Sequence, residues 1–250
     1  MNSRFIQVLS TNFSAIVTTA TVLFATVQLP VHAITFINQR ASLGSNDKID
    51  WSSLGAVNPF HRLPNSFSAQ SVAGHQFSVT VPSFFGNPQP LVFQTLPAPG
   101  IETNFVSNDY ILFTGFTDAK FPGGTNTALL TIAFDQPVKA AGTQIALAYT
   151  SKPYTALVSA FDSDDNLLAT FSTEGHSSQA LDNSAAFLGI ASDTPNISRL
   201  VFRTSEANSP FGINEVSFVA VPESNVGVGL LAFAMCGGLM LKRNNRGRSR

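Results

Sequence analysis

Acidic side chains are densest between residues 162 and 166, where the chain reads Asp-Ser-Asp-Asp-Asn. A calcium ion takes roughly six to eight oxygen ligands, and closely spaced carboxylates in one loop can supply several of them. Asp162, Asp164 and Asp165 are therefore candidate calcium ligands. The competing interpretation is a solvated turn, because Asp and Asn side chains in turns accept hydrogen bonds from their own backbone. We favour the solvated turn.

The order of these acids begins like an EF-hand loop but does not complete one. That loop requires glycine at its sixth position and glutamate at its twelfth, and Leu167 and Ser172 stand there instead. We therefore reject the EF-hand motif. The segment 174–183 is a second stretch that could add oxygen ligands for calcium.

Aromatic side chains are the second group that could do chemistry, because a sugar ring can stack on an exposed aromatic platform. Trp51, Tyr149 and Tyr154 are the possible sugar contacts. Residues 149–154 place two tyrosines and a lysine at a predicted hairpin tip, which makes them the better candidate. Trp51 is more often a core residue, because tryptophan is highly buried on average. A structural role for all three rings is the favoured alternative.

Catalytic motifs are missing from the sequence. It contains no Gly-x-Ser-x-Gly elbow, no His-Glu-x-x-His pair and no phosphate-binding loop. His61, His75 and His176 are far apart and lie in loop-like sequence. A glycosidase needs only two carboxylates at a suitable separation, and 14 acids before residue 221 cannot nominate a pair. The sequence therefore predicts a protein that is not an enzyme.

Charge and cysteine content exclude further classes. Residues 34–220 hold eight Lys and Arg against 14 acids, so this body is acidic and has no basic surface for nucleic acid. The single cysteine is Cys236, outside the body. A body without cysteine has neither disulfides nor thiolate metal sites and depends on its own apolar core.

Strand patterns recur through the body, and no helical period is sustained. Residues 77–81 alternate apolar and polar side chains, as a half-buried strand does. The first third reads as rich in loops. From Tyr110 onward the pattern tightens, and the remaining predicted strands are 110–114, 129–134, 143–148, 154–161, 167–172, 186–190, 200–202 and 213–219. Eight or nine strands at this spacing predict an antiparallel β-sandwich or barrel.

Both ends of the chain carry targeting signals. Residues 15–27 are apolar after Arg4, and Val31-His32-Ala33 supplies small residues at the cleavage position. This layout predicts a secretory signal peptide over residues 1–33, cleaved after Ala33; an uncleaved anchor is the alternative.

At the other end, residues 225–241 are uncharged and precede five basic residues. They predict a short transmembrane helix with a cytoplasmic terminus.

The last thirty residues, 221–250, resemble a known sorting signal. Val221-Pro222-Glu223, a glycine-rich apolar span and an Arg-rich end are similar to the PEP-CTERM signal of Gram-negative bacteria. The resemblance implies recognition and cleavage near Pro222 and Glu223 by a membrane enzyme, exosortase. The fourth motif residue of that family is usually proline, and Ser224 stands there, so a retained helix is the alternative outcome.

Within the body, about residues 110–219 are similar to the jelly-roll domains of PEP-CTERM proteins, which look like galactose-binding or carbohydrate-binding modules. The residues that carry this likeness are 134–138, 160–168 and 211–218. The resemblance implies an exported protein of the cell surface or extracellular matrix. A lectin-like module that binds extracellular polysaccharide is the alternative function.

Overall fold

The computed structural model describes residues 33–55, 60–82, 89–96, 103–115, 129–148, 152–206 and 209–221. Several sequence predictions lie outside these residues: the signal peptide before Ala33, Tyr149, Pro222, Glu223 and the membrane helix 225–241. Within the described part, no helix is long and apolar enough to cross a membrane.

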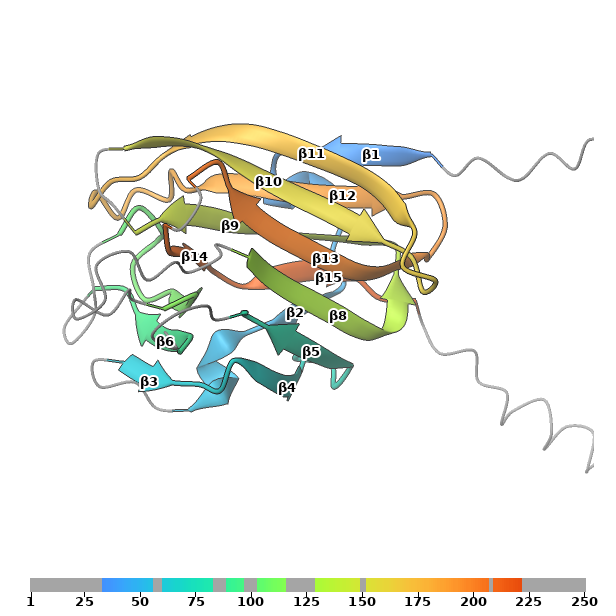
Figure 1. Cartoon of the computed structure of the whole chain (residues 1–250), viewed down its shortest axis with the longest axis horizontal. Helices are drawn as coiled ribbons and strands as arrows, with labels where there is room; N and C mark the ends of the chain where they lie inside the picture. Colours follow the sequence, from blue (N-terminus) through green and yellow to red (C-terminus); the bar gives the residue numbers. More distant parts are fainter. Residues whose placement is uncertain are drawn as a thin grey trace, which may run out of the picture. The chain divides into compact units, whose positions relative to one another are not determined.

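The described chain consists of short and medium β-strands and two 3-10 helices (Figure 1). In its first half these are β1 (Ile34–Ile37), η1 (Arg40–Leu43), β2 (Asp47–Ile49), η2 (Trp51–Leu54), β3 (Phe60–Arg62), β4 (Ser66–Gln70), β5 (Gln76–Thr80), β6 (Leu91–Gln94) and β7 (Tyr110–Phe113). In its second half they are β8 (Leu129–Val138), β9 (Ala140–Leu147), β10 (Pro153–Phe161), β11 (Leu167–His176), β12 (Ala186–Ser192), β13 (Ile197–Thr204), β14 (Phe211–Ile213) and β15 (Val216–Val219).

The strands form two antiparallel sheets, and in Figure 1 sheet B crosses in front of sheet A. Sheet B has the order β11-β10-β13-β8-β5-β4. Sheet A has the order β1-β12-β9-β14-β7-β6-β3, with β15 paired to both β9 and β2. The antiparallel β-sandwich predicted from the strand pattern is confirmed.

The core lies between the two sheets and is built by alternation. In β10 and in residues 129–134 of β8 every second side chain is buried while the others are partly or fully exposed, which is the period that a strand with one solvated face requires. Aromatic rings join the two layers: Phe134 of sheet B packs on Phe218 of sheet A with centroids 5.4 Å apart. Burial of such apolar area supplies most of the stability of a body without disulfides.

β14 and β15 share one edge of β9 but are separate strands. Phe211–Ile213 pairs with the second half of β9 and with β7, whereas Val216–Val219 pairs with the first half of β9 and with β2. Asn214 and Glu215 interrupt the ladder between them. The single strand predicted over residues 213–219 is therefore wrong at this break, because the two intervening side chains enter a polar network described below.

Two glycines allow a close approach of β9 and β12. Gly142 stands opposite Gly189 in the antiparallel register. A Cβ on Gly142 would lie 2.6 Å from Gly189 Cα and 2.7 Å from the Leu188 carbonyl oxygen, closer than any ordinary contact. Glycine at position 142 is thus required by packing.

The loop-rich interpretation of the first third is also wrong. Residues 34–94 contribute six strands, most of only three to five residues. Such strands are too short for their alternation to stand out from the neighbouring turns, and their pairing partners are distant in sequence: β1 pairs with β12, and β2 pairs with β15.

Candidate binding site

Trp51 is a core residue and not a sugar platform. Its side chain has no exposed surface, and its ring meets Phe77 edge to face at 6.2 Å. Its indole Nε1 donates a hydrogen bond to the Asn214 carbonyl oxygen at 2.7 Å. The ring therefore shows no face to solvent, and the proposed sugar contact at Trp51 is wrong.

Tyr154 is likewise closed to a ligand. The residue is 2% exposed, and its hydroxyl donates to the Ile145 carbonyl oxygen at 2.5 Å. Burial raises the pKa of Tyr154 to about 12. Its ring lies against Gly175 of the neighbouring strand, where any Cβ would collide with it. The proposed sugar contact at Tyr154 is therefore also wrong, because the ring is part of the core.

The acidic turn between β10 and β11 satisfies its own backbone. Asp162 Oδ1 accepts from the backbone N–H groups of Asp164 and Asn166, both at 2.9 Å. The Asn166 amide donates to Asp162 Oδ2 at 3.0 Å, and these hydrogen bonds, that side-chain bond foremost, lower the pKa of Asp162. Asp165 adopts a positive φ of 62° and pairs with Arg199 at 2.8 Å. These contacts are those expected of a solvated turn.

Calcium at this turn stays a prediction. Among the residues that the structure describes, no group of three or more His, Cys, Asp or Glu side chains is placed to hold a metal ion.

A buried carboxylate that sequence analysis did not single out organises the turn between β4 and β5. The Asp47 side chain is only 2% exposed. It accepts hydrogen bonds from the Ser71 hydroxyl, from the backbone of Ala73 at 3.0 Å and from the backbone of Lys48 at 2.7 Å. His75 Nδ1 lies 2.8 Å from Asp47 Oδ2. Four donors on one carboxylate fix the position of the whole turn 71–75.

The pKa of Asp47 reflects this arrangement. Burial acts to raise the pKa of the carboxyl, but the hydrogen bonds from Ser71, Ala73, His75 and Lys48 favour the ionised form and lower it below its ordinary value. An ionised carboxylate only accepts hydrogen bonds, so His75 Nδ1 carries the proton. His75 Nε2 makes no hydrogen bond with another of the described residues, so this nitrogen is open to a ligand.

Serine, histidine and aspartate meet at this turn, yet they do not form a hydrolytic triad. In such a triad the serine hydroxyl contacts the histidine, and the histidine contacts the aspartate. Here the Ser71 hydroxyl donates to Asp47, and it accepts from the His75 backbone N–H at 3.0 Å. The imidazole ring does not contact the hydroxyl, and the carboxylate that does contact it also accepts three further hydrogen bonds. The arrangement therefore positions an imidazole and does not prepare a nucleophile.

His75 borders a hollow of about 400 Å³ between the β4–β5 turn, the end of β8 and the end of β15. We call it the His75 pocket. It is lined by residues 73–76 and 134–138 together with Phe218, Ala220 and Val221. Its volume falls in the range of roughly 300–1,000 Å³ that small-ligand sites occupy.

The His75 pocket combines an apolar floor with free polar groups. Phe134 and Phe218 are nearly buried, and the His75 ring meets Phe218 edge to face at 5.9 Å. Gln76, Asp135 and Gln136 are exposed. None of these three side chains makes a hydrogen bond or ion pair with another residue of the described part. Such a hollow can hold a small ligand that has both apolar and hydroxyl-bearing edges.

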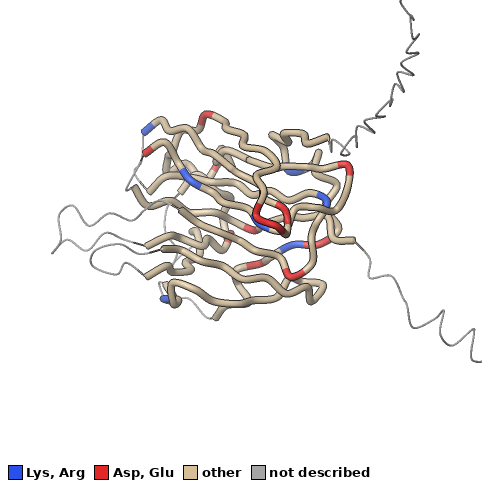
Figure 2. The backbone as a smooth tube through the Cα atoms, turned by 45° about the vertical axis from the view of Figure 1, so that its right-hand side comes forward, with Lys and Arg blue, Asp and Glu red and all other residues tan. Residues whose placement is uncertain are grey.

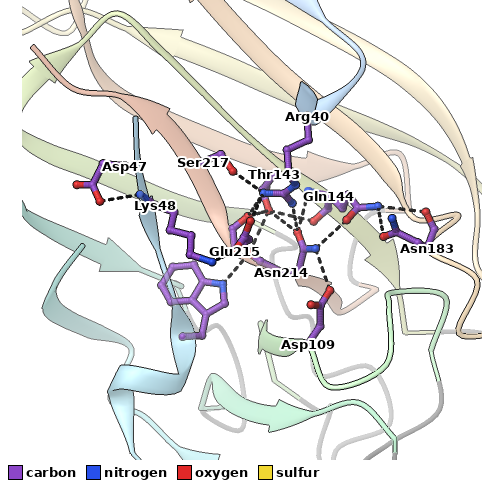
Figure 3. A network of polar contacts seen from close by, with 11 residues as sticks. Arg40, Asp47, Lys48, Asp109, Thr143, Gln144, Asn183, Asn214, Glu215 and Ser217 are labelled. Atoms are coloured by element: carbon purple, nitrogen blue, oxygen red, sulfur yellow. Dashed lines mark hydrogen bonds and ion pairs between the residues drawn. The ribbon is translucent and has the colours of Figure 1, made fainter. Parts of the chain in front are cut away.

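A second polar cluster, shown in Figure 3, holds β15 in place behind the pocket. The amide of Asn214 is buried at the break between β14 and β15, and both of its ends are engaged. Its oxygen accepts from Arg40 Nη2 at 2.7 Å and its nitrogen donates to Gln144 Oε1 at 2.7 Å and to Asp109 Oδ2 at 3.1 Å. This single side chain therefore ties η1, β9 and the segment before β7 to the interrupted strand.

The charged residues of the second cluster neutralise one another. Glu215 pairs with Arg40 at 3.1 Å and with Lys48 at 2.6 Å. A hollow of about 340 Å³ borders all three. Its charged groups are already paired, so it offers a ligand fewer free groups than the His75 pocket. Burial raises the pKa of the nearby Asp109 carboxyl, although its hydrogen bond from Asn214 acts in the opposite direction.

Comparisons with known proteins give structural likenesses alone. No family model and no curated protein matches the sequence. A DUF4465 family protein from Bacteroides caccae is similar over 74% of this chain and 99% of its own, with 12% identity and a TM-score of 0.35. The CBM22-1 xylan-binding domain of Paenibacillus barcinonensis Xyn10C is similar over 67% of this chain and 90% of its own, with 11% identity and a TM-score of 0.24.

A third likeness is to CBM6-3 from Clostridium stercorarium, whose structure was determined in complex with cellobiose. It spans 66% of this chain and 88% of that one, with 10% identity and a TM-score of 0.20. All three TM-scores lie below 0.5, and neither the fold nor the function assigned to this chain depends on them.

Proposed function

We propose that this chain is an exported β-sandwich protein that binds carbohydrate in the His75 pocket and has no catalytic role. The observation that carries the proposal is the imidazole of His75, which a buried Asp47 fixes beside three unpaired polar side chains and above a floor of Phe134 and Phe218. The half-buried His75 ring is held in one orientation by this contact, so a binding site gains a ring nitrogen at a fixed position.

Sugars match the chemistry of this pocket. A pyranose ring presents C–H groups on its faces and hydroxyls around its edge. Pro137 and the exposed Val221 offer apolar surface to the first, and Gln76, Gln136 and Asp135 offer donors and acceptors to the second. Each hydroxyl both donates and accepts, so amide and carboxylate groups together can satisfy it.

Delivery and anchoring form the second part of the proposal. The apolar segment ending at Ala33 supports export through a signal peptide cleaved there. The sequence Val221-Pro222-Glu223 with the following apolar span and basic end supports sorting by an exosortase-type enzyme, with a transient or retained anchor in the inner membrane. The protein would then act at the cell surface or in the extracellular matrix.

A purely structural role on the cell surface is the alternative function. The two are separated by a glycan array followed by calorimetry on the purified full-length protein, with added calcium and again with a chelator. We expect binding to at least one polysaccharide, weakened by about fivefold in Gln136→Ala, which corresponds to one hydrogen bond of about 1 kcal/mol. Calcium dependence would support the acidic turn as a metal site.

The matched control is Gln179→Ala, which removes an exposed glutamine that does not line the His75 pocket. It should bind as the wild type does. If neither the array nor calorimetry detects binding with or without calcium, the carbohydrate-binding proposal fails and the structural role stands.

A further inference from the structure

A second hollow lies at the same end of β8 as the His75 pocket. This second hollow has a volume of about 290 Å³. We call it the Arg199 hollow; it is lined by residues 133–135 together with Pro137, Asp162, Ser163, Asp165, Ser198 and Arg199. Phe134, Asp135 and Pro137 line both spaces. Because the same three side chains form a wall of each, the two hollows adjoin across the end of β8.

We propose that the ligand is an internal segment of a polysaccharide chain without acidic groups, occupying the His75 pocket and the Arg199 hollow together. This inference rests on the proposed carbohydrate-binding function and narrows it to a class of substrate. A mono- or disaccharide would use one hollow, whereas a longer chain that crosses Asp135 reaches both. The expected signature is an affinity that rises with chain length.

The Arg199 hollow is preorganised for a ligand. The Arg199 guanidinium lies over the Phe161 ring, 3.9 Å from its centroid, and donates to Asp165 Oδ1 at 2.8 Å. A guanidinium held by stacking and by an ion pair loses little conformational entropy when it donates its remaining N–H groups. Ser198, which lines the same hollow, has a buried hydroxyl with no hydrogen-bond partner in the described part of the chain. The guanidinium thus leaves N–H groups available to sugar hydroxyls, whereas the Ser198 hydroxyl lies below the surface.

The charge of the combined groove selects against acidic polysaccharides. Asp135 stands between the two hollows without an ion-pair partner among the described residues, and Asp162 and Asp165 border the Arg199 hollow. The turn that carries Asp162 and Asp165 is the longest red stretch of the tube in Figure 2. Arg199 is the cation in this wall, and Asp165 neutralises it. A chain of uronic acids would place further negative charge beside Asp135, which is unfavourable.

The test measures affinity against chain length by calorimetry. The probes are oligomers of glucose, xylose and N-acetylglucosamine from two to six units, with oligogalacturonate as the acidic series. For at least one neutral series we expect the hexamer to bind at least about tenfold more tightly than the dimer. Oligogalacturonate should show no such gain.

Two variants locate the second hollow. Arg199→Ala should weaken binding of the hexamer by about fivefold and leave the dimer unchanged, whereas Gln136→Ala should weaken both. Arg203→Ala is the matched control, because Arg203 is exposed on the same strand and does not line either hollow. Thermal melting of each variant checks that the fold is retained.

The outcomes separate this inference from the function on which it rests. Equal affinity for dimer and hexamer, or an equal effect of Arg199→Ala on both, overturns the extended groove and leaves carbohydrate binding intact. Tighter binding of oligogalacturonate than of every neutral series overturns the charge selection. Absence of binding by all oligomers overturns both the inference and the proposed function.

Discussion

Asp47 and Asp109 are two partly or fully buried carboxylates on the same side of the molecule, and their environments differ. Asp47 accepts four hydrogen bonds, and its pKa is lowered. Asp109 accepts from Asn214 but lies near Glu215, and burial raises its pKa. Folding therefore favours the ionised form of Asp47 and the protonated form of Asp109, so the two residues should respond to pH in opposite directions.

Asp47→Asn should destabilise the protein by about 2 kcal/mol near pH 7, because hydrogen bonds to a charged acceptor are lost or weakened. The folded-state pKa of Asp47 is depressed, so its contribution is present above the unfolded pKa of about 3.9 and is lost as the pH falls through the folded value. The difference between the variant and the wild type should thus shrink in acid. Urea denaturation at several pH values measures it; a constant difference would contradict this assignment.

Asp109→Asn should instead stabilise the protein slightly at pH 7, by less than about 1 kcal/mol because the carboxylate is partly solvated. The folded-state pKa of Asp109 is raised, so the contribution of this residue is most favourable below the unfolded pKa and is lost as the pH rises through the folded value. An asparagine retains the oxygen that accepts from Asn214 and removes the charge. A loss of stability at pH 7 in the same urea experiments would show that the charge is needed.

At the scale of strands, the central position of β9 decides how sheet A is assembled. All eight of its residues are buried, and it pairs with β12 on one side and with β14 and β15 on the other. Small side chains are needed on a strand enclosed in this way, and the sequence Ala-Ala-Gly at its start provides them. The polar residues Thr143 and Gln144 occur where β14 and β15 separate, and both bond to Asn214 there.

Gly142→Ala tests this packing. The added methyl group would meet backbone atoms of Gly189 and Leu188 that cannot move independently of β12, so we expect a loss of roughly 2 kcal/mol or more in the free energy of unfolding. Gly189→Ala is the matched control on the facing residue. Its close contacts would include the Phe187 ring at 3.1 Å and the Ile37 carbonyl oxygen at 3.3 Å, both longer than the contacts at Gly142, so we expect a smaller loss. Equal losses in the two variants would contradict the asymmetry described here.

At the scale of the whole molecule, the body has a defined start and a defined end. Strand β1 begins at Ile34, the residue after the predicted signal cleavage site. At the other end, the Asn46 side chain accepts from the Ala220 N–H at 2.8 Å and donates to the Ala220 carbonyl oxygen at 2.9 Å. These two hydrogen bonds thus hold the backbone of the body two residues before Pro222.

Mass spectrometry of the protein recovered from the extracellular fraction tests the processing proposal. We expect a polypeptide that begins at Ile34 and ends near Pro222, because the strands and the Asn46 contact protect the intervening chain. Recovery of the intact C-terminus at Arg250 in that fraction would contradict processing. The protein would then be one that keeps its membrane helix, as Ser224 in the motif allows.

The sequence predicted the sandwich because its long strands bury alternate residues, and β8, β10 and β11 were located from that period. It also predicted the turn at Asp162, where the chemistry is local. The His75 pocket could not be predicted, because Asp47 and His75 are 28 residues apart and are joined only when β2 meets the β4–β5 turn. The one residue that could have pointed to the His75 pocket is Asp47. It stands two residues before Ile49 on the same strand, so the two side chains share the buried face of that strand. The structural role favoured for the rings of Trp51 and Tyr154 agrees with their burial, and the possible sugar contact was kept because composition does not reveal exposure.

The contacts of β15 also determine how the body would respond to tension. A load applied to the chain beyond Val221 enters along β15, whose hydrogen bonds to β2 and β9 lie across the direction of the strand. Several of these bonds must break together before the strand can slide, and Arg40 adds a side-chain bond to Ser217 at 2.6 Å. A body pulled from its C-terminal end would therefore resist in shear, with the ladders that join β15 to β2 and β9 as its mechanical clamp.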